Sequence, residues 1–184
     1  MSVRIEFEKE LDSVLPNLKV GTLADAMIPT RVVINDECVP PEDHGPREEY
    51  NDVFSVYMVV RNLTEFLASN DEVVTLTPAF PDDDKQMRLE KLDESRVKID
   101  WEYSYPDFEH TEVVDRNALG SELLATGREY IQFAREVVFP HAEANPDWAG
   151  EYGKVYQLDI DREYIDELET HLDDVEKMLA DFDE

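Results

Sequence analysis

The chain has 184 residues, of which 42% are hydrophobic, so it is long enough for one domain with its own core and too apolar for a disordered segment. Its 45 Asp and Glu against 17 Lys and Arg give a formal net charge of −28, which disfavours binding to a nucleic-acid backbone. The single cysteine excludes an intrachain disulfide, and no signal peptide or membrane helix is evident, so we expect a cytoplasmic protein.

Hydrophobic periodicity divides the first part of the chain into short strands and one amphipathic helix. The alternation of Val3, Ile5 and Phe7 with charged residues is typical of a half-buried strand. Further along, apolar side chains at three-and-four spacing predict a helix. The predicted segments are a strand at 2–8, a helical turn at 11–15, a short segment opened by Gly21 and ended by Pro29, a strand at 31–39 with a bulge or turn at Asn35-Asp36, a loop at 40–46 and a helix at 48–69.

A basic hairpin is expected at 85–103, after a strand at 72–77 and a loop that ends in three aspartates at 82–84. Its second strand alternates apolar and charged residues, with Val97, Ile99 and Trp101 on the apolar face. The hairpin holds five of the seventeen basic residues, which are Lys85, Arg88, Lys91, Arg96 and Lys98. These residues predict a face that binds a partner or an anion. The alternative is that they pair with acids across the same hairpin.

Two long helices are predicted in the second half of the chain. The expected order is a loop at 104–111, a short strand at 112–115, a helix capped by Asp115 or Asn117 and running to about Val138, an irregular connection at 139–153, an extended segment at 155–160 and a last helix capped by Asp161. Gly120 and Gly127 would let another backbone approach the first of these helices. The last helix carries an apolar seam at four-three spacing, formed by Ile165, Leu168, Leu172, Val175, Leu179 and Phe182. This seam either docks on its own domain or meets another protein or a second copy of the chain.

The order of these elements predicts a single α+β domain over 1–184, with a largely antiparallel sheet of about five strands and two to three helices on one face. Glycine-rich phosphate loops, HExxH and nucleophile-elbow motifs are all missing from the sequence, and we expect no cofactor. The best local candidate for a metal or acid–base site is the loop with Asp107, Glu109 and His110. A carboxylate beside a histidine is also expected by chance in a chain this acidic.

Acidic residues interrupt every segment of the chain, and its ten arginines outnumber its seven lysines. This composition resembles that of cytoplasmic proteins from extremely halophilic archaea, which implies a surface that stays hydrated in concentrated KCl. An acidic nucleic-acid mimic or a protein with a basic partner is the alternative. The layout of a hairpin followed by a long helix is similar to that of small immunity-type proteins that neutralise a toxin. We therefore expect a halophile-adapted, non-enzymatic protein-binding or regulatory domain, with a metal-binding or hydrolytic enzyme using Asp107–His110 as the alternative.

Overall fold

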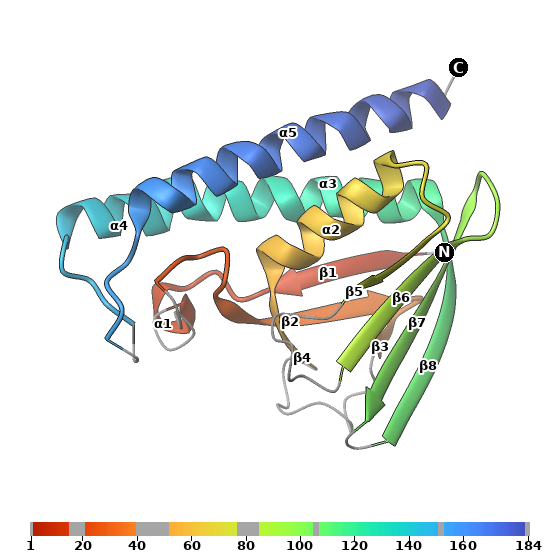
Figure 1. Cartoon of the computed structure of the whole chain (residues 1–184), viewed down its shortest axis with the longest axis horizontal. Coiled ribbons are helices and arrows are strands. Elements are labelled where there is room, and N and C mark those ends of the chain that lie inside the picture. Colours follow the sequence, from red (N-terminus) through yellow and green to blue (C-terminus); the bar gives the residue numbers. More distant parts are fainter. Residues whose placement is uncertain are drawn as a thin grey trace.

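The computed structural model describes residues 2–14, 21–39, 52–76, 85–104, 107–150 and 153–182, some of them by backbone alone. Within these ranges the chain folds into two antiparallel four-stranded sheets and a layer of helices, which confirms the predicted α+β class (Figure 1). Strands β1–β4 form one sheet and β5–β8 the other, and helix α2 lies between the two groups in the sequence. The predicted loop at 40–46 and the three aspartates at 82–84 lie outside the described residues.

Sheet A consists of β1 (Val3–Phe7), β2 (Met27–Ile34), β3 (Glu37–Val39) and β4 (Asp52–Ser55). The central strand is β2, which pairs with β1 on one side and with β3 and β4 on the other. Asn35 and Asp36 form the β2–β3 turn with φ values of 53° and 69°, as tight hairpins require, so the predicted turn is confirmed. Pro29 does not end a segment as predicted; it lies inside β2, opposite Val53.

The helix predicted at 48–69 begins later, at Val56. Helix α2 (Val56–Ala68) is capped by Ser55, whose hydroxyl accepts a hydrogen bond from the Met58 backbone N–H at 3.2 Å. The residues just before it form β4, because their backbone groups pair with the start of β2. Tertiary pairing and a good N-cap together override the helical spacing of the side chains in this segment.

Sheet B has the strand order β5 (Val73–Leu76), β6 (Lys85–Lys91), β7 (Arg96–Ser104) and β8 (Asp107–Asp115). The predicted hairpin at 85–103 is confirmed as β6 and β7, with Met87 opposite Trp101 and Leu89 opposite Ile99. The prediction of a loop at 104–111 is wrong for residues 104 and 107–111, because β8 pairs with β7 along its whole length. Its core face carries His110 and Glu112 next to Val114, so the sequence shows no apolar alternation there.

After β8 the chain forms one almost continuous helix, which is divided into α3, η3 and α4. Helix α3 (Arg116–Phe133) starts at the predicted cap, Asp115, whose carboxylate accepts from the Ala118 N–H at 2.8 Å. It continues through a π-helical turn, η3 (Ala134–Val138), into α4 (Phe139–Ala144), so the irregular connection predicted at 139–153 begins later. Pro140 lies in the first turn of α4. The wider turn before it accommodates a residue that cannot donate an N–H to the preceding helix.

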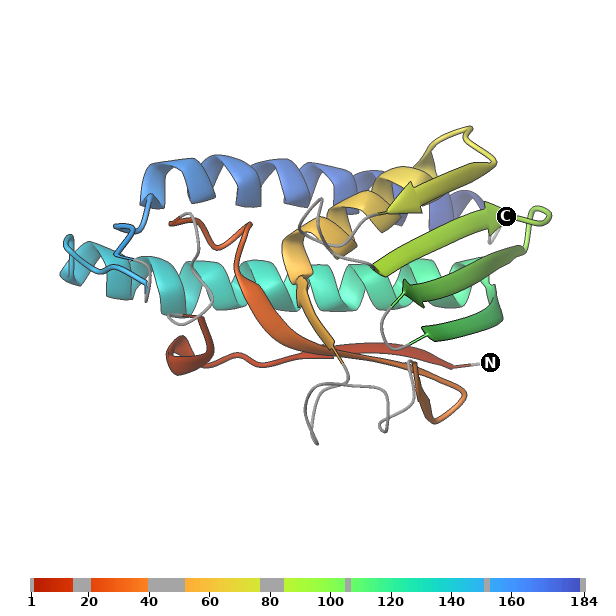
Figure 2. The same ribbon diagram turned by 60° about the horizontal axis from the view of Figure 1, so that its bottom comes forward.

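Helix α5 (Leu158–Phe182) runs antiparallel to α3 across the helical layer, and the short helix α1 (Leu11–Val14) follows β1 (Figure 2). The prediction that Asp161 caps α5 is wrong. Its own N–H donates to the Gln157 carbonyl at 3.1 Å, so the helix starts one turn earlier and Asp161 lies inside that turn. Within the described parts of the chain, no helix is both long enough and apolar enough to cross a membrane.

The apolar seam of α5 is buried within the chain itself. Ile165, Leu168, Leu172 and Val175 are at most 2% exposed, Leu179 is partly buried, and the side chain of Phe182 lies outside the described residues. The two glycines of α3 admit leucine side chains of α5, and not another backbone as the sequence predicts. A Cβ on Gly127 would lie 2.6 Å from the Leu172 methyl Cδ2, and one on Gly120 would lie 3.1 Å from Leu179 Cδ2. The seam therefore docks against the chain's own helices.

Candidate functional site

Four of the five basic residues of the hairpin have described side chains, and each of the four contacts acceptors of the chain itself. On the outer face of sheet B, Arg88 lies 3.1 Å from Glu90 and 3.5 Å from Asp100, and Lys98 Nζ lies 2.8 Å from Asp100. Burial raises the pKa of Asp100, but hydrogen bonds from Lys98 and Thr111 and the nearby charges outweigh it, so the pKa falls below its ordinary value. The carboxylate is thus held ionised between two cations.

The other hairpin cations lie in different places. Arg96 donates two hydrogen bonds to Asp93 in the β6–β7 turn, at 2.6 and 2.8 Å. Lys91 donates to the Ser69 carbonyl and its Nζ lies 4.7 Å from the centre of the Phe66 ring, so it is bound at the end of α2. The side chain of Lys85 lies outside the described residues. Arg88–Asp100 is an ion pair between the two strands, as the alternative predicts, whereas the other contacts lie within one strand, in the turn or at α2. The four described cations do not form one basic patch.

The second predicted site, Asp107–His110, lies on strand β8. Successive side chains of a strand face opposite sides of the sheet, so Glu109 and His110 diverge. His110 Nε2 lies 3.0 Å from Glu112 Oε1 on the core face, whereas Glu109 lies on the outer face. The side chain of Asp107 is outside the described residues. Within the part of the chain that the structure describes, no three His, Cys, Asp or Glu side chains are grouped as metal ligands.

A hollow of about 290 Å³ on sheet B brings parts of both predicted sites together. Its lining includes Arg88 from the basic hairpin and Glu109 from the predicted metal loop, whereas the side chain of His110 lies on the opposite, core face of the strand. Two further acids, Asp100 and Glu102, complete its polar rim. The sequence predicted these residues as two separate sites, because β8 was not expected to pair with β7 along this stretch.

Glu102 and Glu109 lie directly opposite each other in this hollow. They are cross-strand partners in the β7–β8 register, and both side chains are exposed. The next row of the same face places Asp100 beside Arg88 and Thr111, so its charge is compensated. Among the described residues, no cation forms an ion pair with Glu102 or Glu109. Like charges opposite each other in a ladder are destabilising, so this pair is an electrostatic cost of the free protein.

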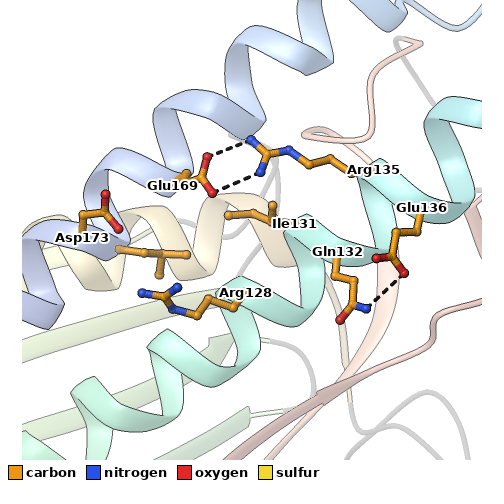
Figure 3. Close-up of a pocket in the computed structure, with 8 residues that line it drawn as sticks. Arg128, Ile131, Gln132, Arg135, Glu136, Glu169 and Asp173 are labelled. Carbon is orange, nitrogen blue, oxygen red and sulfur yellow. Dashed lines mark hydrogen bonds and ion pairs between the residues drawn. The ribbon is translucent and has the colours of Figure 1, made fainter.

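A second cavity, of about 300 Å³, lies between α3 and α5 (Figure 3). Its base is apolar, with Ile131 and Leu172, and its rim carries two arginines. Arg135 is held by Glu169 at 2.8 and 3.1 Å and by Asp166 at 2.8 Å. The hydrogen bond to Glu169 is the main reason why the pKa of Arg135 lies above its ordinary value. These contacts hold α3 and α5 together, so we assign the cavity a structural role.

The sequence predicts Asp161 as a helix cap and does not indicate that it is buried. Its side chain is almost fully buried and accepts hydrogen bonds from the backbone N–H groups of Leu23 and Ala24. Burial raises the pKa of Asp161 to about 6, although the neighbouring Tyr156 hydroxyl and these two N–H groups favour the charged form. Tyr156 is a close neighbour of this acid, and burial is the main reason why the pKa of its hydroxyl lies above its ordinary value. This cluster fixes the start of α5 to the segment before β2.

Comparison with protein-family models, with curated proteins and with solved structures finds no significant match to this chain.

Proposed function

We propose that the chain is a non-enzymatic binding protein whose partner is a basic protein, and that it works in concentrated salt. The observation that carries this proposal is that the described arginines are bound by acceptors of the chain itself, while many carboxylates have no cation to pair with. Eight of the nine described arginines form ion pairs with Asp or Glu, and the ninth, Arg116, donates to the Leu67 carbonyl. The eight are Arg4, Arg31, Arg61, Arg88, Arg96, Arg128, Arg135 and Arg162.

The carboxylates far exceed the cations available to pair with them. Even if each of the 17 Lys and Arg held its own carboxylate, 28 acids would remain without one. These acids need water, salt cations or the cations of another molecule. A surface of this kind repels nucleic acids and favours basic proteins. A basic toxin bound by an immunity-type protein is one specific form of this proposal.

Concentrated salt limits how such a partner is recognised. At 1 M ionic strength the Debye length is about 3 Å, so attraction acts between groups in direct contact. A halophilic binding protein must therefore add contacts that salt does not screen, such as buried apolar surface or backbone hydrogen bonds. The proposal thus predicts a defined interface rather than diffuse attraction to any polycation.

The test is purification of the tagged chain from its own cells in about 1 M KCl, at which long-range attraction is screened. We expect one basic polypeptide to elute with the chain in a fixed molar ratio, and the two purified proteins to form a complex in sedimentation experiments at the same salt. The free tag, expressed in the same cells, is the control. Recovery of the chain only as a monomer or homodimer would contradict the proposal.

A further inference from the structure

The outer edge of β1 in sheet A is covered by a helix, whereas the outer edge of β8 in sheet B pairs with no other described strand. The free edge of β1 is closed by α3: the Ile5 N–H donates to Glu122 Oε1 at 2.7 Å, and the Thr126 hydroxyl donates to the Ile5 carbonyl at 3.2 Å. Strand β8 is the last strand of sheet B, is nine residues long, and pairs with no strand on its other side among the described residues. Among the described residues, its outward-facing backbone groups are therefore open to a further strand.

The register shows which backbone groups lie along this open edge. The Arg116 N–H donates to the Ser95 carbonyl at 2.8 Å, which fixes the alternation of the β7–β8 ladder. In an antiparallel ladder every second residue directs its N–H and C=O away from the neighbouring strand. These residues are Glu109, Thr111 and Val113, which face Glu102, Asp100 and Lys98 across β7. Glu109 and Thr111 also have exposed side chains.

The charge of β8 defines the chemistry of what would pair with it. The strand contains four acids, Asp107, Glu109, Glu112 and Asp115, and no lysine or arginine. On its outer face, Glu109 lies opposite Glu102, with no cation paired to either within the described residues. A lysine or arginine on an added strand next to Glu109 would lie within reach of both carboxylates. It would turn a repulsive pair into a compensated one.

We propose that the open edge of β8 binds an extended, lysine- or arginine-bearing segment of a partner protein, which pairs with Glu109, Thr111 and Val113 as a fifth strand of sheet B. This inference rests on the function proposed above and identifies the surface that performs it. Backbone pairing supplies contacts that salt does not screen, and the glutamate pair selects for basic segments. A second copy of the chain is disfavoured, because β8 against β8 would bring acidic strands together.

The first test uses a labelled ten-residue peptide of alternating lysine and threonine, followed by fluorescence anisotropy in about 0.15 M and about 1 M KCl. We expect saturable binding at both salt concentrations. The matched control is the same peptide methylated on alternate backbone nitrogens, which keeps its charge but cannot pair as a strand. We expect it to bind at least about tenfold more weakly. Equal binding of the two peptides, or no binding of the first, would overturn the proposal.

The second test places proline on the two opposite edges of sheet B. Thr111→Pro removes an N–H that faces away from β7, so the ladder itself is kept, and it should weaken peptide binding about tenfold or more. Thr75→Pro is the matched control, because Thr75 lies opposite Arg88 at an equivalent position of the β5 edge. It should leave binding unchanged. An equal loss in both variants would place the peptide elsewhere.

Thr111→Pro also removes the hydroxyl that donates to Asp100 at 2.7 Å, so it changes a side-chain contact as well as the edge. A measurement on the protein without any substitution is therefore needed. Hydrogen exchange of the unaltered protein supplies it. The amides of Glu109, Thr111 and Val113 should exchange quickly in the free protein and slowly with bound peptide. The intervening amides of β8, which pair with β7, should be protected in both states. Fast exchange at saturating peptide would overturn the proposal.

Glu109→Gln separates recognition from folding. Removing one charge of the Glu102–Glu109 pair should raise the stability of the free protein, yet weaken peptide binding several-fold.

Dimerisation of the chain in sedimentation experiments, if it is lost on Thr111→Pro, would show that a second copy occupies the β8 edge and would overturn the proposal. If a basic partner is recovered but binds the Thr111→Pro chain equally well, the edge is wrong and the proposed function stands. If no basic partner is recovered, the function itself fails.

Discussion

The carboxylate of Asp161 accepts a hydrogen bond from the backbone N–H of Ala24 at 3.3 Å, joining the first turn of α5 to a segment 137 residues earlier in the chain. The neighbouring N–H of Leu23 donates to the same side chain, and the Tyr130 hydroxyl donates to the Leu23 carbonyl at 3.1 Å. Through these hydrogen bonds Asp161 connects the start of α5 to residues 23–24, which in turn contact α3 through Tyr130.

This acid should leave a signature in the pH dependence of stability. Burial raises the pKa of Asp161 in the folded chain to about 6, above the value of about 4 expected when unfolded. The folded state thus binds the proton more tightly, and this contribution is fully present below about pH 4 and is lost as the pH rises through about 6. Because Asp161→Asn cannot ionise, the stability of wild type relative to Asp161→Asn should fall by roughly 3 kcal/mol between those limits.

Urea unfolding of both chains in concentrated KCl, across that pH range, measures this difference. Asparagine keeps one acceptor oxygen but leaves one of the two N–H groups without a partner, which costs about 1–3 kcal/mol. The variant should therefore be the less stable chain in acid, and the gap should narrow towards neutral pH. A gap that stays constant with pH would show that Asp161 does not titrate in the folded protein in this range.

Gly127→Ala should destabilise the protein. The new methyl would lie 2.6 Å from Leu172 Cδ2 and 3.1 Å from Val60 Cγ1, and both of these side chains are buried, so α5 must shift. Overpacking of this kind costs about 1–3 kcal/mol, measured as the free energy of unfolding. Gly120→Ala is the matched control. Its methyl meets only the end of the partly buried Leu179, and a gain in helix propensity of up to about 1 kcal/mol should make it neutral or stabilising.

Truncation of one seam residue tests whether α5 is part of the core. Leu168 is fully buried, so Leu168→Ala should reduce the free energy of unfolding by about 2–5 kcal/mol. Leu92→Ala removes the same atoms from a leucine that is 42% exposed in the β6–β7 turn, and should change stability by less than about 0.5 kcal/mol. Equal effects of the two substitutions would argue against docking of the seam in solution.

The net charge predicts a strong dependence on salt. With a formal charge of −28, self-repulsion opposes the compact state in dilute buffer and is screened as the Debye length falls from about 10 Å at 0.1 M to about 3 Å at 1 M. The unfolding midpoint in urea should therefore rise steadily with KCl. A midpoint that is flat across this range would contradict adaptation to concentrated salt.

Elements with their own local signal were predictable from sequence. The hairpin at 85–103 shows clean alternation on β7, and the seam of α5 repeats at constant spacing, so both were placed correctly. Strand β8 was underestimated because its core face carries His110 and Glu112, which hide the period of two. The start of α2 was misplaced because pairing of β4 with β2 is a contact across the chain. The same holds for the candidate site on sheet B, where Glu102 and Glu109 meet only through the register of two strands.

The closure of β1 by Glu122 and Thr126 has a consequence for how copies of this protein behave when crowded. A sheet that extends from molecule to molecule needs an edge strand with unpaired backbone groups on both of its sides. At the β1 side of sheet A, the backbone groups of Ile5 are already bound by two side chains of the chain's own helix. These two contacts therefore disfavour the addition of a strand from another molecule at the centre of β1, and with it the growth of a fibril through sheet A.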